Sequence, residues 1–168
     1  MTDSDLRSRF LEGMSRGATF VSVITTDGEA GRFGVTVSSM TSVSADGAAP
    51  SLLVCVHHRS PAAAAILGNR MFCANLLHES QHEVSDVFSG RRRDEHHRRF
   101  DGIDWTPGHG RQPVLNGATA SFVCALKTSL LWETHYIMVG EVAEVVLDDS
   151  PQALLYGQRA YRKAVGLS

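Results

Sequence analysis

The apolar positions of the chain change their spacing along its length, and each spacing predicts a different kind of element. Leu6, Phe10 and Met14 recur at intervals of four residues, which predicts a helix over residues 4–14 with one apolar face. From residue 18 onward, β-branched and aromatic residues gather in runs separated by turn residues, which is typical of strands. The predicted strands lie at residues 18–26, from 32 onward, and at 51–57, 71–77, 113–132 and 134–147.

Three further helices are predicted from their first residues. Each opens with a serine that is followed either by proline or, three positions later, by glutamate, and both patterns favour a helix start. The predicted helices span residues 60–67, 80–88 and 150–163. Residues 90–112 are polar and interrupted by glycine, so a long loop is predicted there. This order favours one mainly β domain over residues 1–168, an antiparallel barrel with peripheral helices, rather than a doubly wound parallel sheet.

Composition excludes several classes of protein. The 168 residues carry a formal net charge of -2, so no overall field favours nucleic acid or a membrane. No apolar run approaches the ~20 residues of a membrane span, and the charged N-terminus lacks the apolar core of a signal peptide. Cys55, Cys73 and Cys124 lie in apolar strands without a CxxC pair, which predicts buried thiols in a reducing compartment. We therefore expect a cytoplasmic protein.

The segment HESQH, residues 78–82, matches the zinc-protease pattern H-E-x-x-H. That chemistry requires both histidines on one helical face, one turn apart. The predicted helix start at Ser80 places His78 before the helix and His82 in its first turn. We therefore predict a surface histidine pair and no metal site.

Two basic segments have more than one interpretation. Residues 90–100 hold five arginines and two histidines, and they predict a solvated surface or a contact with a phosphate-bearing ligand rather than nucleic acid. Residues 57–62, HHRSPA, join a strand to a helix N-terminus, where Arg59 and Ser60 predict either an anion site or a plain capped turn. His135, at a strand start, is by itself more typical of a structural or surface residue.

The stretch TVSSMTSVS, residues 36–44, carries six hydroxyl groups in nine residues. Its valines and threonines predict a strand, but a core strand rarely holds so many small polar groups. It could be an edge strand kept polar against aggregation. It could equally be a strand that offers small hydrogen-bond donors to a ligand.

Taken in order, several segments resemble the flavin reductase-like family of split-barrel flavin-binding proteins. The resemblance spans residues 10–163 and rests on an ordered set of motifs. They are GVTVSSMTSVSADGAAPSLLVCV, HRS, FCANLL, SQHEVSDVFSG, RFDGIDWTPGHGRQPVLNGATASF, THYIMVGEV and LLYGQRAYR. The resemblance implies an antiparallel, Greek-key split barrel. It also implies an NAD(P)H-dependent flavin reductase that transfers a hydride from the nicotinamide to FMN or FAD.

The resemblance also implies which residues form the site. The ring or ribityl candidates are Thr36, Ser38, Ser39, Ser42, Ser44 and Asn75, and the flavin phosphate candidates are Arg59 and Ser60. Ser80 and Gln81 are implied to hold ribityl or phosphate oxygens. His135 is implied to orient the nicotinamide as the catalytic residue. The candidates near the pyridine nucleotide are Tyr156, Arg159, Tyr161 and Arg162.

The chain departs from the family pattern at His58, Pro61 and Glu133. His58 and Pro61 flank the implied phosphate residues. Glu133 stands where the family often has glycine, and its charge favours NADH over NADPH, whereas Arg91–Arg93 would favour the opposite.

The resemblance further implies a non-covalent, exchangeable flavin, a homodimer, and a partner flavin-dependent monooxygenase that receives reduced flavin. The rival hypotheses are a non-catalytic flavin-binding protein and a split-barrel reductase or oxidase that uses bound FMN on another substrate.

Overall fold

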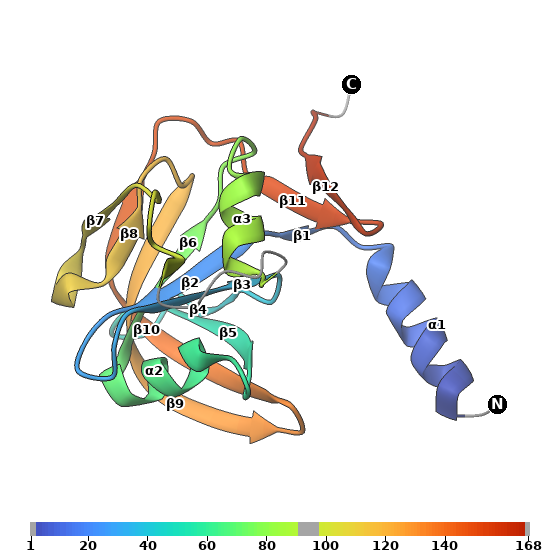
Figure 1. Ribbon diagram of the computed structural model, residues 1–168, viewed down its shortest axis with the longest axis horizontal. Coiled ribbons are helices and arrows are strands. Elements are labelled where there is room, and N and C mark those ends of the chain that lie inside the picture. The colour runs from blue at the N-terminus through green and yellow to red at the C-terminus, as the bar shows by residue number, and fades with distance from the viewer. Residues whose placement is uncertain (1–2, 91–97, 167–168) are drawn as a thin grey trace.

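The computed structural model describes residues 3–90 and 98–166, and there it is built mainly from antiparallel strands (Figure 1). The helices are α1 (Asp3–Ser15), α2 (Pro61–Asn69), α3 (His82–Phe88) and the 3-10 helix η2 (His109–Arg111). The first strands are β1 (Thr19–Phe20), β2 (Ser22–Thr26), β3 (Phe33–Val37), β4 (Thr41–Ser44), β5 (Ser51–His57) and β6 (Met71–Leu76). The later strands are β7 (Trp105–Pro107), β8 (Pro113–Leu115), β9 (Ala120–Trp132), β10 (His135–Leu147), β11 (Leu154–Gly157) and β12 (Ala160–Lys163).

The main sheet has seven strands in the order β3-β2-β6-β9-β10-β5-β4, and all neighbours run antiparallel. β3 and β4 are consecutive in the chain but form opposite edges of this sheet. Ser39, in the loop between them, hydrogen-bonds the backbone of Cys55 on β5, so the sheet curls back toward β3. The result is a curled, open sheet, which confirms the prediction of a mainly β, antiparallel fold.

The predicted helix over residues 150–163 is wrong, because this segment forms the β11–β12 hairpin. Gln158 and Arg159 have φ angles of 51° and 60° and make the two-residue turn of this hairpin. Leu154 donates its backbone N–H to the Leu77 carbonyl, and β11 pairs with β1. The Ser150-Pro151 pair favours a helix start, but these distant partners satisfy the backbone of an extended strand, and tertiary context overrides a weak local preference.

The helix after Ser60 is confirmed as α2, whereas the capping box at Ser80 is wrong. α3 begins at His82 with Gln81 at its N-cap, and neither α2 nor α3 has a side-chain cap. The Ser80 hydroxyl instead lies 2.8 Å from Nδ1 of His78, so it is not available to the first turn of α3. His78 therefore precedes the helix and His82 begins it, as expected from the sequence.

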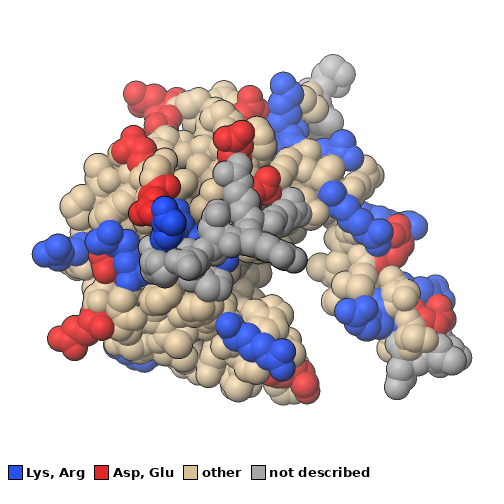
Figure 2. All heavy atoms as spheres, viewed as in Figure 1, with Lys and Arg blue, Asp and Glu red and all other residues tan. Residues whose placement is uncertain are grey.

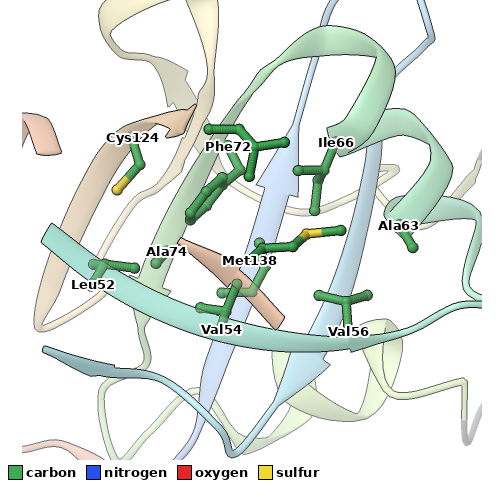
Figure 3. Packing of buried hydrophobic residues seen from close by; sticks show 11 residues of the cluster. Leu52, Val54, Val56, Ala63, Ile66, Phe72, Ala74, Cys124 and Met138 are labelled. Carbon is green, nitrogen blue, oxygen red and sulfur yellow. The ribbon is translucent and has the colours of Figure 1, made fainter. Parts of the chain in front are cut away.

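The main core fills the inside of the curled sheet beneath α2. Figure 3 shows Ala63 and Ile66 of α2 close to Phe72 and Met138, which come from two strands of the sheet. These four side chains are fully buried. Burying each large one contributes about 1.5–3 kcal/mol. A second core, which includes Phe88, lies under α3 and fixes that helix to the sheet.

The three cysteines are free thiols, with Cys73 and Cys124 buried and Cys55 half-buried. Burial raises the pKa of the Cys124 thiol to about 12. Burial, and then the neighbouring Cys124, raise the pKa of Cys73 as well. Two of the three therefore behave as small apolar core residues, as predicted.

α1 projects from the body of the protein (Figure 1). Near the C-terminal end of α1, Glu12 forms an ion pair of 3.5 Å with Arg159, which lies in the turn between β11 and β12. The predicted apolar face is present, but Leu6, Phe10 and Met14 are 55%, 62% and 61% exposed. This face is therefore not part of the core of its own chain.

Acidic and basic side chains are interspersed over the face of the protein shown in Figure 2. This face therefore carries no broad field of one sign. Among the described residues, no helix is both long and apolar enough to cross a membrane.

Candidate active site

A small cavity of about 140 Å³ lies between the end of β3, helix α3 and the β11–β12 hairpin. Hydroxyl groups and two aromatic rings form most of its wall. The lining residues are Val21, Thr36, Val37, Ser38, Ser85, Ser89, Tyr156 and Tyr161. Four of them, Thr36, Ser38, Tyr156 and Tyr161, were predicted as site residues from the sequence. We call this space the tyrosine cavity.

The two rings of the tyrosine cavity are held in a defined geometry. Tyr156 and Tyr161 meet edge to face, with ring centroids 5.6 Å apart and an interplanar angle of 72°. The Tyr161 hydroxyl donates to Oδ1 of Asp86 at 2.6 Å and lies 3.0 Å from Oγ of Ser85. Thr36 donates its hydroxyl to the Ser85 carbonyl at 2.7 Å. Hydrogen bonds thus connect β3 to β12 through two consecutive residues of α3.

A larger, open hollow of about 610 Å³ adjoins the tyrosine cavity and shares the Tyr161 ring as a wall. Its lining residues are Glu79, Ser80, His82, Leu154, Tyr161, Arg162 and Lys163. We call it the basic hollow, because Arg162, Lys163 and His82 outnumber its one carboxylate. It contains two further predicted residues, Ser80 and Arg162. Arg159, by contrast, lies in the hairpin turn and lines neither space.

Ser42 and Ser44 lie on β4, away from the tyrosine cavity. They line a third space of about 510 Å³, which is largely apolar and which we call the apolar groove. Its lining residues are Phe20, Met40, Thr41, Ser42, Ser44, Ala45, Pro50, Ser51, Leu52, Leu76, Phe122, Val142 and Val145. The hydroxyl-rich stretch is therefore divided between two different surfaces.

Three predicted residues have their side chains engaged inside the protein. Asn75 is fully buried; its amide nitrogen donates to the Val23 carbonyl, and its amide oxygen accepts from Ser121 and from the Leu115 N–H. This network engages the Asn75 side chain within the fold, and its predicted contact with the flavin ring stays a prediction.

The side chains of Gln81 and Ser39 hold loops in place. The Gln81 side chain accepts from the His78 N–H and donates to the Asn116 carbonyl. The Ser39 hydroxyl is taken by the backbone of Cys55, so it too is engaged within the fold.

The turn between β5 and α2 contains both of the predicted flavin phosphate residues. Ser60 occupies the N-cap of α2 without making a side-chain capping bond, and Arg59 beside it is exposed. His57 and His135 are register partners on β5 and β10, and their rings lie 5.0 Å apart at an angle of 77°. His135 therefore belongs to this turn and lines neither the tyrosine cavity nor the basic hollow.

The electrostatics of this turn favour an anion. The pKa of His57 is lowered. The first cause is that neighbouring groups displace water from its ring, and the second is the positive charge of His135, His58 and Arg59. A bound anion would offset this mutual repulsion, and the positive end of the α2 helix dipole favours the same sign of charge.

The zinc pattern at residues 78–82 does not form a metal site in the described part of the chain. His78 uses its ring nitrogens on Ser80 and Ser150, and the His82 ring lies 6.1 Å from Tyr161. Among the described residues, no cluster of three metal-ligating side chains is found.

Most of the arginine-rich stretch at residues 90–100 lies outside the described residues, so its predicted role stays a prediction. At its described end, Arg98 pairs with Asp101 on the surface, and the buried Arg99 donates to the Phe88 carbonyl.

Sequence reasoning missed the contribution of α3. Ser85 and Ser89 line the tyrosine cavity, Asp86 holds the Tyr161 hydroxyl, and His82 lines the basic hollow. One signal was available, since serines four residues apart lie on the same face of a helix. Lys163, which lines the basic hollow next to the predicted Arg162, was also missed.

Comparison with known proteins identifies the family of this chain. The flavin reductase like domain matches residues 14–164 of the chain. The FMN reductase (NADH) RutF of Stutzerimonas stutzeri (strain A1501) is 36% identical over 156 residues, covering 93% of this chain and 87% of the relative. The FMN reductase (NADH) RutF of Pantoea ananatis (strain LMG 20103) is 34% identical over 155 residues, covering 92% and 80%.

Solved structures lead to the same family. Nitrilotriacetate monooxygenase component B from Mycobacterium thermoresistibile superposes with a TM-score of 0.87 at 28% identity, covering 98% of this chain and 89% of that one. BorF, the flavin reductase component of a bacterial two-component tryptophan halogenase, superposes with a TM-score of 0.80 at 32% identity, covering 93% and 97%. The family resemblance of the sequence is thereby confirmed: this chain belongs to the flavin reductase-like family.

Proposed function

We propose that this protein is an NADH-dependent flavin reductase that uses FMN as an exchangeable, non-covalently bound substrate. The observation that carries the proposal is the tyrosine cavity, where hydroxyls of residues 36–38 meet two aromatic rings from residues 156–161. Relatives named FMN reductase (NADH) support this choice of flavin and nicotinamide. In the reaction, NADH gives a hydride to flavin, a proton comes from solvent, and the products are NAD⁺ and reduced flavin.

The described residues fit a flavin at two points. The ring edge presents hydrogen-bond acceptors, which suit the Ser38 hydroxyl as donor. It also presents one N–H, which suits the Thr36 hydroxyl as acceptor, since the Thr36 proton goes to the Ser85 carbonyl. The phosphate suits the Arg59 charge and the Ser60 hydroxyl at the start of α2, where the positive end of the helix dipole lies. Ser39 is bonded to Cys55, two residues before His57, so the chain between residues 36 and 39 connects the two points.

The two cofactors supply the redox chemistry, and the chain supplies binding and alignment. A hydride carries its own electrons, so no general base is needed. Tyr156 and Tyr161 wall the site against water, and holding two rings at reacting distance can contribute ~7–11 kcal/mol. Arg162 in the basic hollow is proposed to bind phosphate oxygens of the dinucleotide. His135, beside the α2 turn, is proposed to orient the nicotinamide.

A homodimer is part of this proposal. The apolar groove, the exposed apolar face of α1 and the exposed side chains of Phe20 and Val145 are surfaces that a monomer would leave in water. Each chain carries both the groove, which Phe20 lines, and the projecting helix α1, which precedes Phe20 in the sequence. A two-fold axis would let each copy bury both surfaces of the other, as an isologous interface requires.

The product is proposed to serve a partner flavin-dependent monooxygenase in the cytoplasm. Component B of nitrilotriacetate monooxygenase and the reductase component of a tryptophan halogenase are structural neighbours. The tyrosine cavity is small and the basic hollow open, which suits a flavin that leaves after reduction. Three free thiols suit a reducing compartment.

Steady-state oxidation of NADH by the purified protein, with FMN, with FAD and without flavin, tests the proposal. The same series with NADPH completes the comparison. Saturable turnover that depends on added flavin, fastest with NADH and FMN, is the expected result. Flavin binding without turnover would instead favour a non-catalytic flavin-binding protein. Tight flavin retention with turnover only on a second substrate would favour a bound-FMN reductase or oxidase.

A further inference from the structure

We propose that Asp86 is a positioning residue that holds the Tyr161 ring between the tyrosine cavity and the basic hollow, and so sets the affinity for the nicotinamide. The inference rests on the proposed function. It adds a residue of α3 that neither the sequence pattern nor the flavin contacts single out.

The strand that carries Tyr161 cannot position the ring by itself. β12 has four residues and is the edge of a three-stranded sheet in which its partner is β11. Ala160, Arg162 and Lys163 are exposed, and Tyr161 alone on this strand is half-buried. A short edge strand near the chain end leaves its side chains several rotamers.

The contact with Asp86 selects one arrangement. The phenolic oxygen carries a single proton, which goes to Oδ1 of Asp86 at 2.6 Å, a length typical of a charge-assisted hydrogen bond. The same oxygen can then accept from the Ser85 hydroxyl at 3.0 Å. Asp86 is itself fixed, since α3 is anchored by buried Phe88 and by the bond from Thr36 to Ser85.

The position of this ring decides the shape of two neighbouring spaces. Tyr161 lines both the tyrosine cavity and the basic hollow, so its displacement would join them and admit water. Thr36 on β3 and Arg59 and Ser60 at the α2 turn, which are proposed to bond the flavin, lie on other elements and stay in place when this ring moves. Arg162, which is proposed to bind the dinucleotide, follows Tyr161 on β12. Loss of the Asp86 contact should therefore weaken NADH binding far more than FMN binding.

The test uses the full-length protein and compares Asp86→Ala, Tyr161→Phe and the double variant, with Asp101→Ala as control. Asp101 is an exposed carboxylate whose described partner is Arg98 on the surface. Each single variant should raise KM for NADH about ten-fold, while the Kd for FMN, from flavin fluorescence quenching, stays within about two-fold. The double variant should be no worse than either single, because both remove the same contact. Asp86→Asn keeps an acceptor oxygen and should recover most of the NADH affinity.

Independent, additive effects of the two single variants would overturn the inference. So would an unchanged KM for NADH in Asp86→Ala, or a loss of FMN affinity that follows a lower melting temperature. In each of these cases wild-type turnover would leave the proposed function standing. A wild-type protein that oxidises no NADH with any flavin would overturn the proposed function and this inference together.

Discussion

Ser39 and Cys55 are joined by a reciprocal pair of hydrogen bonds: the Cys55 N–H donates to Ser39 Oγ at 2.9 Å, and Ser39 Oγ donates to the Cys55 carbonyl at 3.1 Å. The residues of β5 that pair with β4 are Ser51, Leu52 and Leu53, so this ladder ends before Cys55. One side chain thus replaces a strand partner at the place where the sheet curls. A hydroxyl implied to contact flavin is engaged in holding the fold.

Replacing Ser39 by alanine should lower the free energy of unfolding by about 1–3 kcal/mol, because two backbone groups of Cys55 lose their partner. Urea denaturation of the two proteins measures this difference. Ser42→Ala is the matched control, since Ser42 is exposed on β4, and it should change stability by less than about 0.5 kcal/mol. Equal stability of Ser39→Ala and wild type would contradict the structural role.

Arg59→Ala should weaken FMN binding by roughly 10–100-fold, which corresponds to a lost charge-assisted contact of about 1.5–3 kcal/mol. Riboflavin, which lacks the phosphate, should bind wild type and variant alike. Titration of both flavins by fluorescence quenching makes the comparison. Lys127→Ala removes an exposed cation that pairs with Glu141 and should leave both affinities unchanged. A similar loss for riboflavin would place the phosphate elsewhere.

Stability should fall as the pH is lowered below about 6.5, the ordinary pKa of histidine. The folded protein lowers the pKa of His57, through lost hydration and then the charges of His135, His58 and Arg59. Below about pH 6.5 the unfolded chain binds more protons than the folded one, so the free energy of unfolding rises with pH and falls on acidification. Urea midpoints between pH 8 and pH 5 measure the slope for wild type and His57→Asn. The slope should be shallower in the variant, and an identical slope would contradict the assignment.

Phe10→Asp and Val145→Asp should each convert the proposed homodimer to a monomer, because a carboxylate would be buried in an apolar contact. Light scattering after gel filtration gives the mass directly. Val165→Asp is the control, because Val165 is 77% exposed and belongs to neither surface. A dimer that persists in both variants would show that copies meet through another face, and a monomeric wild type would remove the homodimer proposal.

Much of the fold follows from local chemistry. The i, i+4 spacing of Leu6, Phe10 and Met14 predicted α1, and the Ser60-Pro61 pair predicted the start of α2. β-branched runs predicted the long strands β9 and β10. These elements agree with the structure because their own residues favour them, whatever lies beside them in space.

The candidate site is less local, so the sequence located it only in part. Thr36, Ser38 and the two tyrosines line one cavity, and their predicted contacts with flavin and nucleotide stay predictions. Asn75, by contrast, is engaged by Val23, Leu115 and Ser121, which are distant in the chain. A hydroxyl or amide in a sequence can serve a ligand or the fold, and only its neighbours in space distinguish the two.

By itself, therefore, the sequence determined the antiparallel β class, the first two helices and the family. Tertiary structure alone decided that residues 150–163 form a hairpin, because β1 and Leu77 offered a sheet edge to Leu154. That hairpin carries Tyr161 to Asp86 on α3, a contact between residues 75 positions apart. Local preferences act over a few residues, whereas the pairing of strands depends on which backbone groups remain unsatisfied once the whole chain has folded.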